Sequence, residues 1–437
     1  MLPDALVAHF AGRHVLQGIL RNTGWLFAGR VFRMGVGLFV GVWVARYLGP
    51  ERFGLYNYAI ALVALFSSLA TLGLTNIVVR DVVLTPSSKN EILGSAFGLR
   101  LCGGGAALIM AISVCVVIRP HDRAMAYLVA VIATGSVFSA FDAIDFWFQS
   151  QLMSKFTVLA KNVAFIVIAV TKVLLVVYKA PLVMFACAGT LEIALASLGL
   201  LVVYHRAGGS FRLWRFRLAR AKSLLHDSWP LIFSGMLGSV YRRIDQVMLG
   251  GIASDEEVGI YSAAVRLGEA WYFIPMALMM STLPSIVEAR QTSEELFYAR
   301  LQRTYNAMAL LAYAVAIPTT FLANAIVDLL FGGAYERAGP MLTLLIWAGL
   351  PINLGVARAA FFTAMNWTRA SLAMSAAGCV LNVALNLLLI PTYGGMGAVV
   401  ATLISYAVAG VFACFLYRPL FRTGRMLIKA MVWPKIW

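Results

Sequence analysis

Long apolar runs alternate with short polar connectors along almost the whole chain. A helix that crosses a bilayer needs about 20 largely apolar residues, so the pattern predicts about twelve such helices and an all-α polytopic membrane protein. The longest connectors, residues 205–222 and the tail from 418 onward, are both basic. The expected spans are 22–46, 54–80, 93–118, 124–149, 156–178, 182–205, 228–252, 259–287, 303–331, 340–364, 369–390 and 396–417.

The composition supports a membrane protein and argues against other classes. Only 12% of the residues are charged and 61% are hydrophobic, whereas soluble proteins carry about 25% charged residues. The net charge of +16 could indicate nucleic-acid binding. The basic residues instead cluster between apolar runs, so no nucleic-acid partner is expected. Charged residues interrupt the first 20 positions, so no cleaved secretory signal is expected.

The distribution of lysine and arginine predicts the orientation. Of the 35 such residues, eight lie in expected spans and six in connectors that would face outward, which leaves 21 on the inner side. Lys161 is counted among these 21. Cytoplasmic connectors carry the excess of positive charge, so both termini are expected in the cytoplasm. The outward six are Arg46, Arg52, Arg119, Arg123, Lys179 and Arg337.

A short motif occurs once in each half of the chain. Phe53-Gly54-Leu55-Tyr56 follows the first expected turn, and Val258-Gly259-Ile260-Tyr261 follows the acidic triplet 255–257, which is expected to form a short loop. The offset is 205 residues (259 − 54). We therefore expect two parallel six-helix repeats, 1–205 and 228–437, joined by a basic cytoplasmic linker, 206–227. Contact with anionic lipid is expected for this linker, with docking of a partner as the alternative.

Several kinds of chemistry lack their usual residues. The five cysteines are scattered in apolar runs without a C-x-x-C spacing, and the histidines lie at span edges or in connectors. The dipeptide Gly-Lys is absent, which excludes a phosphate-binding P-loop. We expect neither a metal site, nor a catalytic residue, nor an enzymatic activity.

Arginines inside the apolar runs are the main candidates for contacting a cargo. Charge within a span is costly and is typical of a lined cavity. Alternatives are snorkelling for Arg30 and Arg33, and structural pairs within 242–245 and 266–269. The excess of arginine favours an anionic cargo, because the guanidinium fork suits phosphate oxygens. The candidates are Arg30, Arg33, Arg242, Arg243, Arg266 and Arg358.

Acidic residues in the same runs are candidates for binding a coupling ion, either H⁺ or Na⁺. Two of them lie one turn apart near the expected cytoplasmic end of span four. Glu192 could carry a proton or pair with Lys172, and the sequence leaves both interpretations open. The candidates are Asp142, Asp145, Glu192, Asp245 and Glu269.

Three segments resemble the oligosaccharide-lipid flippases of the multidrug/oligosaccharidyl-lipid/polysaccharide (MOP) exporter superfamily, most of all the O-antigen and related polysaccharide-repeat flippases. They are 24–56, with its Ala45-Arg46-Tyr47-Leu48-Gly49-Pro50 turn, 245–284, and 382–394. Phe146-Trp147-Phe148-Gln149 is also similar. The resemblance implies two six-helix lobes in a V around a central cavity, alternating access, and undecaprenyl-pyrophosphate-linked oligosaccharide as cargo. It maps the cavity arginines onto Arg30, Arg33, Arg242 or Arg243, and Arg266.

The expected function is therefore a flippase that moves lipid-linked oligosaccharide repeat units outward across the bacterial inner membrane. The expected partners are the cargo and the membrane lipids, with a polysaccharide polymerase and chain-length proteins as further candidates, and the protein is expected to be a monomer. A cation-coupled multidrug exporter of the same fold is the alternative. A membrane polymerase or glycosyltransferase would need a catalytic loop larger than any connector here.

Overall fold

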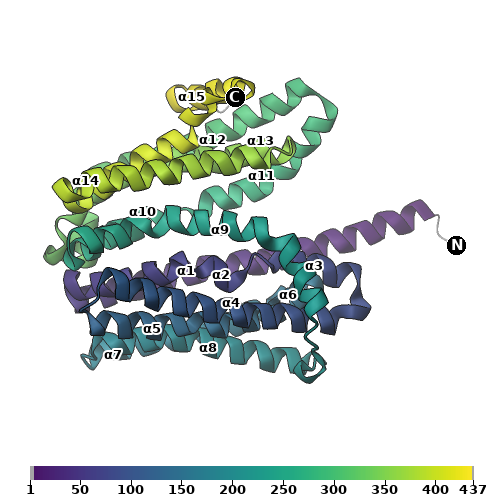
Figure 1. Cartoon of the computed structure of the whole chain (residues 1–437). Coiled ribbons are helices and arrows are strands. Elements are labelled where there is room, and N and C mark those ends of the chain that lie inside the picture. The colour runs from purple at the N-terminus through teal and green to yellow at the C-terminus, as the bar shows by residue number, and fades with distance from the viewer. Residues whose placement is uncertain (1–3, 436–437) are drawn as a thin grey trace. The chain divides into compact units, whose positions relative to one another are not determined.

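The computed structural model describes residues 4–435, which form helices and short connections without any strand (Figure 1). The α-helices are α1 (Asp4–Leu65), α2 (Ser67–Thr71), α3 (Thr75–Leu84), α4 (Lys89–Ile118), α5 (Arg123–Phe138), α6 (Ala143–Ser150), α7 (Ser154–Val177), α8 (Leu182–Arg206), α9 (Leu218–Ile252), α10 (Asp255–Glu269), α11 (Phe273–Thr292), α12 (Glu294–Phe331), α13 (Ala338–Ala364), α14 (Thr368–Gly410) and α15 (Phe421–Val432). Short 3₁₀ turns are η1 (Pro86–Ser88), η2 (Ser139–Asp142), η3 (Phe211–Leu213), η4 (Gly333–Tyr335), η5 (Phe412–Leu416) and η6 (Arg418–Leu420).

The predicted polytopic all-α fold is confirmed. Within the described part of the chain, 10 helical stretches are long and apolar enough to cross a membrane. Helix α14 bends at Gly394, where φ is 55°, and so covers two expected spans, while the more polar α9 contains expected span seven. Helix α1 bends at Gly49, where φ is 72°. Expected span two is interrupted, because the chain leaves helical geometry at Leu72 and Gly73 before α3 begins.

The chain divides into two compact units, whose bounds differ from the predicted halves. Unit 1 comprises Met1–Val44 and Leu62–Met236, and unit 2 comprises Ala45–Ala61 and Leu237–Trp437. The end of the first expected span and the start of the second thus pack with the C-terminal helices. The equivalence of two six-helix repeats and their V-shaped arrangement remain predictions.

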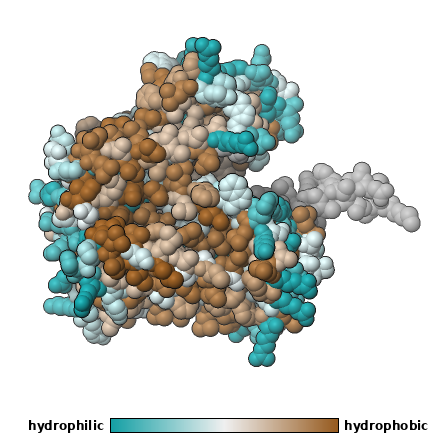
Figure 2. Space-filling view, viewed as in Figure 1, coloured by the Kyte–Doolittle hydropathy of each residue, from teal (hydrophilic) through white to brown (hydrophobic). Residues whose placement is uncertain are grey.

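Unit 1 is built on α4, α5, α7 and α8, which run side by side (Figure 1). Small residues allow α4 to pack closely on its neighbours: a Cβ on Gly103 would meet the Leu69 carbonyl oxygen of α2, and one on Gly104 would meet that of Ser136 on α5. The flanks of these helices are apolar and the hydrophilic residues gather at the helix ends (Figure 2). Such an apolar band matches the hydrocarbon region of a bilayer.

The basic connector 206–217 is docked on unit 1 through its backbone and aromatic side chains. Asn90 and Ser95 on α4 bond the backbone of 215–217, and the Trp214 indole N–H donates to the Tyr204 hydroxyl at 3.1 Å. Rings of Phe97 and Trp214 pack at 5.9 Å between centroids. The connector nevertheless exposes apolar and basic side chains, namely those of Phe211, Arg212, Leu213 and Arg215. The expected contact with anionic lipid remains a prediction for these side chains.

Two aspartates hold the start of α9 against α3. Asp81 accepts from Arg80 at 2.9 Å and from Arg220 at 3.0 Å. Arg80 also reaches Asp227 at 2.8 Å, and this hydrogen bond lowers the pKa of the Asp227 carboxyl. A lowered pKa means that this contribution is complete above the usual carboxylate value of about 3.9 and is lost only as the pH falls below it.

Unit 2 has its apolar core between α11, α12 and α13, closed by α15 (Figure 1). Helix α15 is held by its backbone carbonyls: Tyr313 donates to that of Met431 at 2.5 Å, and Gln302 to that of Met426 at 3.1 Å. Arg422 pairs with Glu294 at 2.8 Å. The C-terminal basic segment is therefore part of the folded unit.

The acidic triplet 255–257 was expected as a loop, and that expectation was wrong. These residues form the first turn of α10, with Ser254 as N-cap accepting from the Glu257 amide at 3.2 Å. Carboxylates at a helix N-terminus are stabilised by its free N–H groups and dipole. Glu257 then reaches beyond α10: it accepts from the Gly395 amide at 2.7 Å and pairs with Arg337.

Candidate functional site

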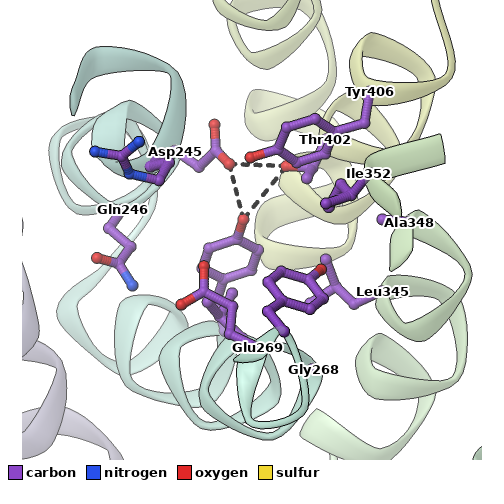
Figure 3. Close-up of a pocket in the computed structure, with 13 residues that line it drawn as sticks. Asp245, Gln246, Gly268, Glu269, Leu345, Ala348, Ile352, Thr402 and Tyr406 are labelled. Carbon is purple, nitrogen blue, oxygen red and sulfur yellow. Dashed lines mark hydrogen bonds between the residues drawn. The ribbon is translucent and has the colours of Figure 1, made fainter. Parts of the chain in front are cut away.

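A small, partly open cavity of unit 2 lies between α9, α10, α13 and α14 (Figure 3). Its volume is about 30 Å³, enough for a water molecule or a bare ion and far below the several hundred Å³ of a typical small-molecule pocket. It is lined by Arg242, Asp245, Gln246, Tyr261, Val265, Gly268, Glu269, Tyr272, Leu345, Ala348, Ile352, Thr402 and Tyr406.

The Asp245 carboxylate is the central group of this cavity. It is 4% exposed. One oxygen accepts from the hydroxyls of Thr402 at 2.7 Å and Tyr261 at 2.9 Å (Figure 3). The other accepts from the Asn386 amide at 2.8 Å. All three donors are neutral. A buried carboxylate with only neutral partners leaves its negative charge uncompensated.

A second layer of polar side chains extends along α14. The Asn386 amide also donates to Asn382 at 3.2 Å, and Asn382 donates to Ser405 at 3.3 Å. The Asn386 side-chain oxygen is buried without a hydrogen-bond partner in the described chain. Asp245, Thr402, Asn382 and Asn386 therefore supply carboxylate, hydroxyl and amide oxygens, the ligand types that hard cations prefer.

The alternative of structural charge pairs within 242–245 and 266–269 finds no ion pair in the described part of the chain. Arg242 shares the cavity lining with Asp245 but is exposed, and no ion pair joins them. Arg266 and Glu269 likewise form none. The Arg266 guanidinium lies over the Phe53 ring, 5.5 Å from its centroid, and its Nη1 is buried without a partner. Glu269 lines the cavity (Figure 3).

Arg358 and Arg243 are the two further arginine candidates of unit 2. Arg358 is 7% exposed, donates to the Cys414 sulfur at 3.3 Å and stacks over the Phe362 ring at 5.2 Å. These neighbours belong to the apolar core, not to the cavity. Arg243 is partly buried. The assignment of these two arginines to cargo binding remains a prediction.

Unit 1 holds a separate charged cluster around Asp142 and Asp145. Lys161 bridges both carboxylates, at 2.8 Å and 3.0 Å, and Arg100 binds Asp142 at 3.3 Å. Lys161 was counted as part of a cytoplasmic connector, which was wrong, because it lies two turns inside α7. The two aspartates were expected to bind a coupling ion, yet cationic side chains already contact both.

The other predicted residues of unit 1 lie as follows. Arg30 is exposed and Arg33 is partly exposed on α1, with Arg33 close enough to act electrostatically on Asp142. Glu192 lies 3.7 Å from Lys172. The pairing interpretation of Glu192 is thus confirmed, and a proton-carrying role remains a prediction.

The sequence did not single out Arg100, Tyr261, Thr402 or the two asparagines as functional residues. Asn382 and Asn386 are four residues apart, a spacing that places both on one helix face. This spacing could have identified the two asparagines from the sequence. Hydroxyl groups in apolar helices usually bond their own backbone. The Tyr261 and Thr402 hydroxyls instead bond Asp245 on another helix. No pattern in the neighbouring sequence predicts such a contact.

Comparisons with known proteins agree with this architecture. The sequence profile described as "Polysaccharide biosynthesis protein" matches residues 19–290, and the MatE profile matches residues 230–388. The putative O-antigen transporter of Shigella flexneri is 24% identical over 357 residues, 76% of this chain and 77% of that protein. The probable flippase AglR of Haloferax volcanii is 26% identical over 179 residues, 40% of this chain and only 37% of that protein.

Solved structures of the same fold cover nearly the whole chain. An inward-facing multidrug resistance MATE family transporter of the MOP superfamily aligns with a TM-score of 0.71 and 17% identity, over 91% of this chain and 95% of that one. The lipid II flippase MurJ in an inward closed conformation aligns with a TM-score of 0.70 and 14% identity, over 93% and 91%. The chain belongs to the polysaccharide biosynthesis protein family and has the fold of the MOP superfamily.

Proposed function

We propose that this protein is a flippase for undecaprenyl-pyrophosphate-linked oligosaccharide, moving repeat units from the cytoplasmic to the periplasmic leaflet of a bacterial inner membrane. The observation that carries the proposal is the family profile, which covers residues 19–290. Relatives named as flippases or as an O-antigen transporter support it. A polysaccharide polymerase and chain-length proteins would then be its functional neighbours.

The physical problem in such transport is the anionic head group. Hydrocarbon offers no replacement for the lost hydration of a pyrophosphate, so fixed cations must supply it. Arg33, Arg242 and Arg266 lie in apolar helices and are suited to this task. With the inside of the cell negative, an outward-moving anion gains about 2.3 kcal/mol per charge per 100 mV. The lipid tail would remain in the bilayer throughout.

In this proposal the cavity around Asp245 binds the coupling ion. Its volume of about 30 Å³ suits a desolvated monovalent ion or a proton with one water, and excludes a sugar. Asp245 would supply the charge, and the Thr402, Asn382 and Asn386 oxygens would complete the coordination after small rotations. Binding there would replace hydrogen bonds that already join α9 to α14, and so would couple an ion gradient to the packing of these helices.

A cation-coupled multidrug exporter is the second candidate, because the MatE profile matches residues 230–388. The two functions differ in the charge of the cargo. An exporter of cationic drugs needs uncompensated acids in its cargo path, whereas Arg242, Arg243 and Arg266 place positive charge in these helices. This charge balance favours the flippase.

Transport in proteoliposomes tests the proposal. The purified protein would be reconstituted with a fluorescent prenyl-pyrophosphate-linked oligosaccharide, and a membrane-impermeant quencher would report movement between leaflets. We expect movement that depends on the protein and responds to an imposed Na⁺ or H⁺ gradient. Uptake of a cationic dye without movement of the lipid-linked sugar would instead establish the exporter.

A further inference from the structure

The charged cluster of unit 1 contains more cations than anions. Lys161 contacts Asp142 and Asp145 at 2.8 Å and 3.0 Å, and Arg100 contacts Asp142 at 3.3 Å. Arg33 lies on α1, which packs closely on the helix that carries Lys161. Three positive groups thus lie in this region with two carboxylates, and two of them, Lys161 and Arg100, contact the carboxylates directly. Within an apolar helix bundle an excess cation is costly unless an anion accompanies it.

The packing of α1 on α7 brings Arg33 to this cluster. A Cβ on Gly29 would meet Val158, and one on Gly37 would meet the Phe165 ring. Arg33 lies four residues from each glycine, on the same face of α1. Lys161 lies between Val158 and Phe165 on α7, so the two cations occupy the same level of the helix pair.

The cluster has a buried side and an open side. Arg100 is 2% exposed, and its Nε has no hydrogen-bond partner among the described residues. The side chains of Asp142 and Lys161 are 32% and 21% exposed, and Arg33 is partly exposed. An incoming anion could therefore reach Arg33 and Lys161 first, with Arg100 behind them.

We propose that Arg33, Lys161 and Arg100 form a binding subsite for a diphosphate group, and that Asp142 occupies it when no ligand is bound. This inference rests on the proposed function for the identity of the cargo. A diphosphate offers more acceptor oxygens and more charge than one carboxylate, so it can displace Asp142 from Lys161 and Arg100. Released Asp142 would turn toward the open side, where it is already one-third exposed.

The same geometry argues against the predicted cation site in unit 1. The Lys161 ammonium stands between the two carboxylates at hydrogen-bond distance, where a coupling cation would have to bind. A free cation would have to compete with the Lys161 ammonium, which is covalently attached to α7. It would also add to the positive charge already present in the cluster. In this proposal Asp142 competes with the diphosphate for Lys161 and Arg100, and Asp145 holds the Lys161 side chain in position.

Direct binding to the purified full-length chain in detergent tests this subsite. The probes are inorganic pyrophosphate and a short-chain prenyl diphosphate, with the corresponding prenol and phosphatidylglycerol micelles as comparison. Lys161→Gln should weaken binding of both diphosphates about tenfold or more, because a charge-assisted contact is lost. Asp142→Asn should strengthen it severalfold. Lys161→Arg should retain binding.

Lys172→Gln is the matched control, since Lys172 lies on the same helix with the same 21% side-chain exposure and pairs with Glu192. It should leave diphosphate binding unchanged. Weaker binding in Asp142→Asn, with a normal melting temperature, would overturn the proposal, because it would make the cluster a structural network. Equal binding of phosphatidylglycerol would reassign the site to a lipid head group and overturn the diphosphate assignment.

These outcomes are separate from the test of the flippase. Tight, Asp142-sensitive diphosphate binding without movement of lipid-linked oligosaccharide would retain the subsite and refute the transport function. Transport that is unaffected by Lys161→Gln would retain the function and refute the subsite.

Discussion

Gly54 of α1 and Gly259 of α10 pack directly against each other, and the contact is reciprocal. A Cβ on Gly54 would meet the Asp255 carbonyl oxygen and the Gly259 amide, and one on Gly259 would meet the Pro50 carbonyl oxygen and the Gly54 amide. Gly54 and Gly259 are 205 residues apart in the sequence, and so are Pro50 and Asp255. The repeat-equivalent segments therefore touch through the same surface on each, as across a local two-fold axis.

The first prediction follows from this contact. Gly54→Ala or Gly259→Ala should lower the stability of the detergent-purified protein by about 1–3 kcal/mol, because the obstructing atoms are backbone and cannot rotate away. The melting temperature measures the effect. Gly105→Ala on α4 is the control, since a Cβ added there would have nothing within 4 Å. Equal melting temperatures for all three variants would contradict the close approach.

The second prediction concerns the coupling ion. A bound ion stabilises the state that binds it, so the melting temperature of the protein should rise with Na⁺ concentration or change with pH. Asp245→Asn should abolish this response while preserving the fold, because asparagine has the same size. Glu256→Gln on the exposed first turn of α10 should retain the response. An undiminished response in Asp245→Asn would place the ion elsewhere.

The third prediction separates the two contacts of Glu257. Glu257→Ala should destabilise unit 2 by about 1–3 kcal/mol, because it leaves the buried Gly395 amide without an acceptor. Arg337→Ala should cost less than about 1 kcal/mol, since the Arg337 side chain is 60% exposed. Melting temperatures of the two variants compare these costs. A larger loss in Arg337→Ala would show that the ion pair dominates.

The fourth prediction concerns the docked connector. Asp81→Asn removes the charge that holds both Arg80 and Arg220, so trypsin should cleave within 212–220 several times faster than in the unmodified protein. Asp227→Asn should have a smaller effect, because it removes one contact of a 39% exposed side chain. If both variants are cleaved at the rate of the unmodified protein, the hydrogen bonds from the connector backbone to Asn90 and Ser95 are sufficient to hold the connector in place.

The fifth prediction concerns topology. In a variant whose native cysteines are replaced by alanine, Glu336→Cys should react with a membrane-impermeant maleimide on spheroplasts, whereas Lys222→Cys should react only after lysis. Both positions are exposed. The reverse pattern would invert the orientation derived from the lysine and arginine distribution.

The helical fold could be predicted, and Asp245 could be singled out as a candidate, because their signals are local; a function for Asp245 remains a prediction. An apolar run of sufficient length must form a helix in a membrane, and a lone acid within such a run stands out. The contact between Gly54 and Gly259 involves two positions that the sequence had already paired, because they occur in similar short motifs. The assignment of 45–61 to unit 2 depends on contacts between helices that are far apart in the sequence. No short motif predicts which of these helices pack together.

Two local signals were present but were not used. Ser254-x-x-Glu257 has the spacing of a capping box, which predicts a helix start and not a loop. Lys161 lies inside an apolar run, where an unpaired ammonium would be costly, so a nearby acid was to be expected. Which acid it contacts could not be predicted, because Asp142 and Lys161 meet only through the packing of α6 and η2 on α7.

The division of α1 and α9 between the units limits how the protein can move. The chain passes from one unit to the other at 44/45, at 61/62 and at 236/237, and the last of these lies inside the continuous helix α9. Two of the three passages also lie within α1. Any relative motion must therefore be absorbed by bending of helices and not by a slack linker. For the same reason, a single cut in the connector 206–217 would not release an intact unit, since the stretch 218–236 that follows it still belongs to unit 1.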